Sequence, residues 1–106
     1  MLFRSKLGVV LINRGETREA VAELRRADGL QPDMPETLLE LGKATAASGE
    51  TGTAEKLFRR VLDQEQTSML AESAHFQLAQ IYRKQGRLPD ADREMKLFQE
   101  MRKNRK

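Results

Sequence analysis

The apolar residues of this chain recur at intervals of three and four, which is the spacing of one face of an α-helix. No segment reads as a strand. The pattern predicts an all-α fold of about six antiparallel helices. The predicted helices cover residues 3–14, 18–30, 36–48, 53–64, 70–85 and 89–102.

Glycine and proline mark the boundaries of these predicted helices. Gly15 can adopt the left-handed conformation that ends a helix, and Thr17 then suits the N-cap of the next one. Pro32 and Pro35 break the chain after residue 30, and Pro89 suits the first turn of the last helix. The first two predicted helices therefore form a hairpin that turns at Gly15.

The sequence repeats itself with a period of 34 residues. Leu7-Gly8 recurs as Leu41-Gly42, and Gly15-Glu16-Thr17 recurs as Gly49-Glu50-Thr51. A third copy follows 37 residues after the second, where Leu41-Gly42 becomes Leu78-Ala79. The repeats predict a single domain over residues 1–106, with hairpins at 1–34, 35–68 and 72–105, an insertion at 69–71 and a basic C-terminal tail.

Small residues and large residues recur at the same positions of each copy, in a way that suits close packing. Gly42 and Ala54 are small enough to let paired helices approach, whereas Phe58 is large enough to fill the space between neighbouring hairpins. One hairpin cannot bury its apolar face alone, so the copies are expected to stack.

A helical hairpin with this period and these positions resembles the tetratricopeptide repeat family, in its bacterial type. The resemblance covers nearly the whole chain, although His75 stands where the family prefers an aromatic residue. It implies a solenoid of three hairpins in a right-handed superhelix. The matching residues are Leu7, Gly8, Leu11, Ala20, Leu24, Ala27 and Pro32 in the first copy, Leu38, Leu41, Gly42, Ala54 and Phe58 in the second, and Leu78, Ala79, Tyr82 and Ala91 in the third.

The resemblance implies a non-catalytic scaffold for protein–protein interaction, with a peptide or a partner helix in the concave groove. The first helix of each hairpin lines that groove, and its inward positions lie three to four residues apart. The predicted groove combines apolar and basic residues, which favours a partner with apolar anchors and an acidic or C-terminal carboxylate group. The groove positions are Ser5, Val9, Ile12, Asn13, Leu39, Lys43, Ala46, Ala47, Phe76, Gln80, Arg83 and Lys84.

Two alternatives for function remain. The chain starts a repeat with apolar residues and ends in a helix that carries Leu97 and Phe98, so exposed terminal faces could form a homodimer. The same faces suggest a fragment of a longer protein. An RNA-binding helical array is the weaker alternative, because Glu36 and Glu40 lie in the second copy of the groove, and we expect no nucleic-acid partner.

Composition excludes several classes of function. The chain has no Cys and one His, which excludes a disulfide framework, a thiol nucleophile and a multi-His metal centre. We find no phosphate-binding loop and no nucleophile–base pair, so we expect no enzyme and no cofactor. The net charge is +3, and the tail at residues 102–106 is basic. No stretch approaches the roughly 20 apolar residues of a membrane span, and no signal peptide is evident, so we expect a soluble chain, with the cytoplasm slightly favoured.

Overall fold

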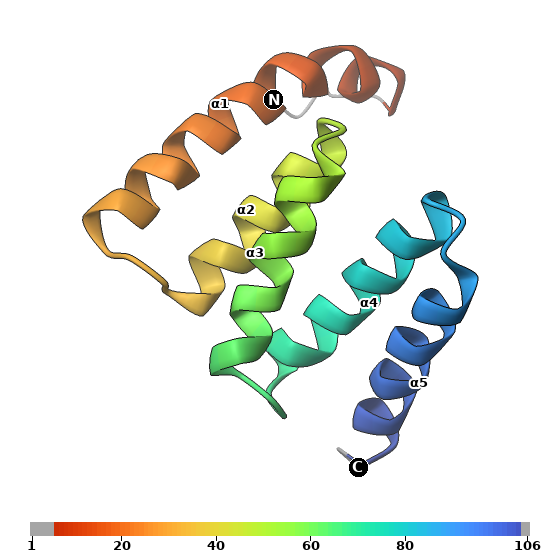
Figure 1. The fold of residues 1–106 in the computed structure, drawn as a ribbon. Helices are drawn as coiled ribbons and strands as arrows, with labels where there is room; N and C mark the ends of the chain where they lie inside the picture. The colour runs from red at the N-terminus through yellow and green to blue at the C-terminus, as the bar shows by residue number, and fades with distance from the viewer. Residues whose placement is uncertain (1–5, 105–106) are drawn as a thin grey trace.

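The computed structural model describes residues 6–104, with side chains from Glu16 onward, and within this range it contains five helices and no strand. Each helix packs on the next one in the chain, and α2 also lies beside α4 (Figure 1). The prediction of an all-α helical-repeat solenoid is therefore confirmed. The helices are α1 (Lys6–Leu30), α2 (Pro35–Ala47), α3 (Thr51–Gln64), α4 (Met69–Lys84) and α5 (Leu88–Asn104).

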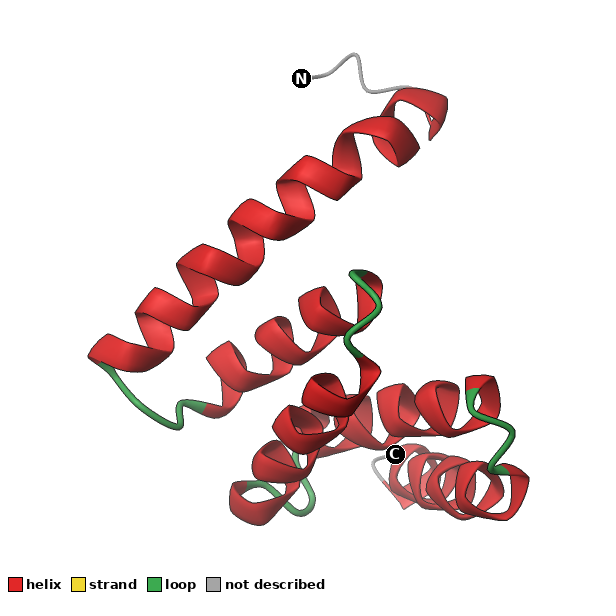
Figure 2. Ribbon diagram, turned by 45° about the horizontal axis from the view of Figure 1, so that its top comes forward, coloured by secondary structure: helices red, strands yellow, loops and turns green. Residues whose placement is uncertain are grey.

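The first repeat differs from the prediction. α1 runs without a break for 25 residues, so the turn predicted at Gly15 is wrong and five helices replace the six expected. Figure 2 shows α1 as one long rod that continues past the end of α2. The other four helices begin and end within two residues of the predicted limits, and residues 69–71, predicted as an insertion, form the first turn of α4.

The contrast with the second repeat gives the physical reason. There the same Gly-Glu-Thr sequence forms a turn, with Gly49 at φ +92°. Two hydroxyl groups support the end of α2: Thr45 Oγ1 donates to the Gly42 carbonyl at 3.0 Å, and Ser48 Oγ donates to the Thr45 carbonyl at 2.9 Å. At the equivalent positions, 34 residues earlier, the sequence has Leu11 and Arg14, which carry no hydroxyl group. Glycine alone therefore does not end the helix, because its cost inside a helix is only about 1 kcal/mol.

The core lies among α2, α3, α4 and α5. Its largest fully buried side chains are Tyr82, Phe58, Leu38 and Leu78. The predicted close approach of small and large residues occurs between α2 and α3, where a Cβ added to Gly42 would come within 2.6 Å of the Phe58 ring. Helix α2 can pack on α3 at this distance because residue 42 has no side chain.

Because of this contact, we expect alanine to have opposite effects on stability at two helical glycines, Gly42 and Gly52. We expect Gly42→Ala to lower the free energy of unfolding by about 1–2 kcal/mol, since the overpacking penalty exceeds the gain in helix propensity. Gly52→Ala is the matched control, because a Cβ at Gly52 meets nothing within 4 Å, and it should raise stability by about 0.5–1 kcal/mol. Urea denaturation followed by circular dichroism measures both. An equal gain for the two variants would contradict the packing of Gly42 on Phe58.

Candidate functional site

A hollow of about 210 Å³ opens between α2 and α4, the first helices of the second and third hairpins. It is thus on the side of the array that the repeat pattern assigns to the groove. Both helices supply residues at spacings of three and four, so that one face of each helix is presented to the hollow. The lining residues are Lys43, Ala46 and Ala47 of α2, Thr51 of α3, and Gln77, Gln80, Ile81 and Lys84 of α4.

The shape of the hollow follows from the sizes of these side chains. Ala46 and Ala47 are small, so α2 leaves room opposite α4. Ile81 is only 3% exposed and gives the hollow an apolar wall. Gln77 and Gln80 each offer a hydrogen-bond donor and an acceptor. The hollow can therefore hold a side chain that has both an apolar and a polar part.

The charge of the hollow is positive. Lys43 and Lys84 line it, and no carboxylate is among its lining residues in the part of the chain that the structure describes. Lys43 Nζ lies 3.1 Å from Glu40 Oε2 at the rim, where both side chains are well exposed, so the pair is weak and open to exchange. Lys84 stands in the last turn of α4, where the helix dipole favours a cation. An anionic group is the charge that suits this site.

Five of the predicted groove residues meet in this hollow. Arg83 is exposed at the end of α4 but is not among the lining residues. Leu39 and Phe76 do not reach the hollow: Leu39 is 5% exposed and belongs to the core, and the Phe76 ring packs on Phe98 of α5 with 5.1 Å between centroids. The five that meet are Lys43, Ala46, Ala47, Gln80 and Lys84.

The predicted groove residues of the first copy are placed only in part. Val9, Ile12 and Asn13 lie within α1, but their side chains are outside the described ones, and Ser5 is outside the described residues altogether. Because α1 does not turn at Gly15, residues 9–13 form no separate first helix beside α2.

The sequence analysis did not predict three of the lining residues. Gln77 and Ile81 share a helical stripe with Gln80 and Lys84, so adding the neighbours at three and four residues would have found them. Thr51 is different, because it is the first residue of the following helix. Only the turn after α2 brings it to the hollow, and nothing in its own sequence context indicates this position.

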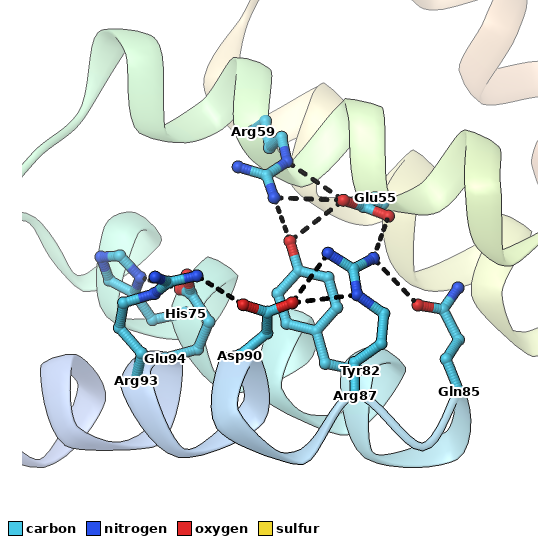
Figure 3. Close-up of polar contacts among 9 residues, drawn as sticks. All are labelled: Glu55, Arg59, His75, Tyr82, Gln85, Arg87, Asp90, Arg93 and Glu94. Atoms are coloured by element: carbon cyan, nitrogen blue, oxygen red, sulfur yellow. Dashed lines mark hydrogen bonds and ion pairs between the residues drawn. The ribbon is translucent and has the colours of Figure 1, made fainter.

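A second polar cluster joins α3, α4 and α5 (Figure 3). The phenol of Tyr82 donates to Glu55 Oε2 at 3.0 Å, and Arg59 also donates to this carboxylate, at 3.1 Å. Arg87 covers the Tyr82 ring at 4.3 Å and reaches Asp90 of α5 at 2.9 Å. Burial, together with the hydrogen bond to Glu55, raises the pKa of the Tyr82 phenol above its usual value. The cluster is a structural junction between hairpins.

His75 takes part in a separate contact between α4 and α5. Its Nδ1 lies 2.6 Å from Glu94 Oε1, and the two side chains are 13% and 10% exposed (Figure 3). His75, which stands where the family prefers an aromatic residue, is partly buried. The pairing with Glu94, 19 residues away, had no signal in the sequence.

Other kinds of site were sought in the same part of the chain. Among residues 16–104, no group of three His, Asp or Glu side chains is placed to hold a metal ion. None of the helices between residues 6 and 104 has the length and apolar character needed to cross a membrane.

Comparison with known proteins gives one match. A family model described as tetratricopeptide repeat matches residues 5–69 and, in a second overlapping match, residues 39–92. The two matches begin 34 residues apart (39 − 5 = 34), which is the period of the sequence repeat, and together they span residues 5–92. Neither the search of curated proteins nor that of solved structures gave a match.

Proposed function

Because the chain belongs to the tetratricopeptide repeat family, we propose that it is a non-catalytic scaffold that holds an acidic segment of a protein partner between α2 and α4. Repeats of this family generally mediate protein–protein interaction. The observation that carries the finer proposal is the basic hollow at Lys43 and Lys84.

The size of the hollow suits one anchoring side chain. At about 210 Å³ it exceeds the roughly 150 Å³ of a cavity that accepts a benzene-sized ligand. The methylene groups of a Glu side chain can contact Ala46 and Ile81, while its carboxylate accepts hydrogen bonds from Lys43 and Lys84. A C-terminal carboxylate on an apolar last residue satisfies the same groups. The rest of the partner segment would follow the faces of α2 and α4.

We therefore expect peptides selected for binding to be rich in acidic residues. A display library of random dodecapeptides is panned against the wild type and against Lys43→Glu/Lys84→Glu. The selected acidic peptides should bind this variant at least about tenfold more weakly, since two attractive contacts become repulsive. Fluorescence anisotropy with the synthetic peptides measures the Kd, and added salt should weaken binding to the wild type.

The control is Lys96→Glu/Lys103→Glu, which makes the same change of charge on α5. Both lysines are exposed, and neither lines the hollow. This variant should bind the acidic peptides with nearly the wild-type Kd. If the two variants lose affinity equally, net charge and not the hollow determines binding. Circular dichroism must first show that both variants are as helical as the wild type.

A further inference from the structure

The straight α1 leaves uncovered a face that is buried in the next repeat. In α3, the residues Ala54, Phe58 and Val61 are 0% exposed, because α2 and α4 pack around them. Their equivalents on α1, 34 residues earlier, are Ala20, Leu24 and Ala27. Ala20 and Leu24 are only partly buried, and Ala27 is exposed. This α1 face therefore lacks the first helix that would complete its hairpin.

Helix α2 is uncovered on the side where the same missing helix would lie. Ala44 is partly buried and Glu40 is exposed. The residues 37 positions later on α4 are Ile81, which is 3% exposed, and Gln77, which is partly buried. α4 has the first helix of the preceding hairpin, α2, beside it, whereas no such helix lies beside α2 among residues 6–104. Two neighbouring helices thus lack cover on the surface that one additional helix would fill.

The chain contains a segment whose sequence fits this place. Residues 6–14 carry Leu7-Gly8 in the register of Leu41-Gly42 on α2. However, this segment lies in the same rod as the uncovered face, and residues of one straight helix cannot pack on that helix's own side. At 1.5 Å per residue, the 25 residues of α1 span about 37 Å, so its first part points away along the helix axis. The matching segment must come from another molecule.

We propose that two copies of this chain pair through α1, antiparallel, so that residues 6–14 of each copy complete the first hairpin of the other. The second repeat gives the register. There Gly42 meets Phe58 around a centre at Glu50, since 50 is the mean of 42 and 58. The equivalent pair is Gly8 and Leu24, with its centre at Glu16. Two antiparallel α1 helices crossing at Glu16 place Gly8 against Leu24 of the partner twice, in one symmetric interface. This pairing is independent of the proposed peptide site.

Engineered cysteines test which chain supplies the covering helix, because the natural sequence has no Cys to interfere. A tagged Gly8→Cys chain is mixed with an untagged Leu24→Cys chain under mild oxidation. The exchanged dimer should give a disulfide between the two chains on a non-reducing gel. In the second repeat, a Cβ added to Gly42 would clash with Phe58. A Cβ at position 8 would meet Leu24 in the same way, and Leu24→Cys avoids this because cysteine is smaller than leucine. Gly8→Cys mixed with Lys96→Cys is the control and should give little product.

Substitutions at Gly15 and Thr17, the equivalents of the turn residues Gly49 and Thr51, offer an independent test of the pairing. Light scattering after size exclusion measures the dimer. Relative to a monomer that closes its own first hairpin at Gly15, as the second repeat does at Gly49, Gly15→Ala should favour the dimer about thirtyfold, since each alanine favours the continuous helix about fivefold and a dimer contains two. Thr17→Pro should weaken dimerisation by about four orders of magnitude, since a proline inside the helix disfavours the continuous helix by about two orders of magnitude in each of the two chains. Proline breaks the helix there, yet it is tolerated in the first turn of a new one, where the equivalent Thr51 begins α3.

Three results would overturn the pairing. The first is a monomer at every concentration with both Gly15→Ala and the wild type. The second is a disulfide within one chain in the Gly8→Cys/Leu24→Cys double variant, because it shows a closed hairpin. The third is a dimer that forms no link between Gly8→Cys and Leu24→Cys chains. If Thr17→Pro fails to fold, as judged by circular dichroism, Gly15→Ala and the cysteine pair still decide the question.

Discussion

Replacing Phe58 with alanine is expected to lower the free energy of unfolding by about 3–5 kcal/mol. Phe58 is fully buried, and its ring fills the space left by Gly42 on the facing helix. Truncation removes the ring that packs on Gly42 of α2, and the glycine cannot fill the resulting cavity. Since domains of this size are stable by only about 5–15 kcal/mol, we expect the variant to be largely unfolded well below the wild-type melting temperature.

Thermal and urea unfolding followed by circular dichroism measure this loss. Phe58→Leu is the control, since it keeps most of the apolar volume and should cost about 1–1.5 kcal/mol. Each hairpin of a repeat array is stabilised by its contact with the next one. We therefore expect the loss of stability in α2 and α3 to destabilise the neighbouring helices as well. If Phe58→Ala unfolds together with the wild type, the packing of α2 on α3 around this ring is incorrect.

The contact of Gly42 with Phe58 could be predicted from the sequence because it repeats. A small residue on the first helix and a large one on the second recur at a fixed separation in the copies. The spacing of three and four along α2 and α4 then predicted five residues of the hollow, since helical geometry fixes which side chains share a face. Periodicity thus predicted the helical-repeat architecture and five of the residues that line the hollow.

The errors arise where a feature depends on a partner that periodicity does not identify. Gly15 and Gly49 stand in the same tripeptide, but the turn at Gly49 also uses the hydroxyl groups of Thr45 and Ser48. Phe76 has the spacing of a groove residue, yet it lies near enough to α5 to pack on Phe98 instead. A helical period predicts which face of the helix a side chain lies on only to within one adjacent position. Groove and core faces are themselves only one position apart, so the period alone cannot assign such a residue to one of them.

Removing the imidazole of His75 is expected to cause the second large loss of stability, about 3 kcal/mol for His75→Leu. Glu94 is the only charged residue that is buried among residues 16–104, and His75 Nδ1 is 2.6 Å from its Oε1. Leucine fills part of the space but offers no hydrogen bond, so a nearly buried carboxylate loses its partner. The cost is that of desolvating Glu94 without compensation, and not the strength of the pair itself.

A double-mutant cycle separates these two contributions. The variant His75→Leu/Glu94→Leu replaces both polar groups with apolar ones, so we expect it to recover most of the stability that His75→Leu loses. The coupling free energy between the two positions should then be at least about 2 kcal/mol, measured by urea denaturation of the four proteins. Strictly additive losses would mean that the two side chains do not interact. Recovery in the double variant would instead mean that the pair adds little to the stability of the array, since a pair of leucines supplies it equally well.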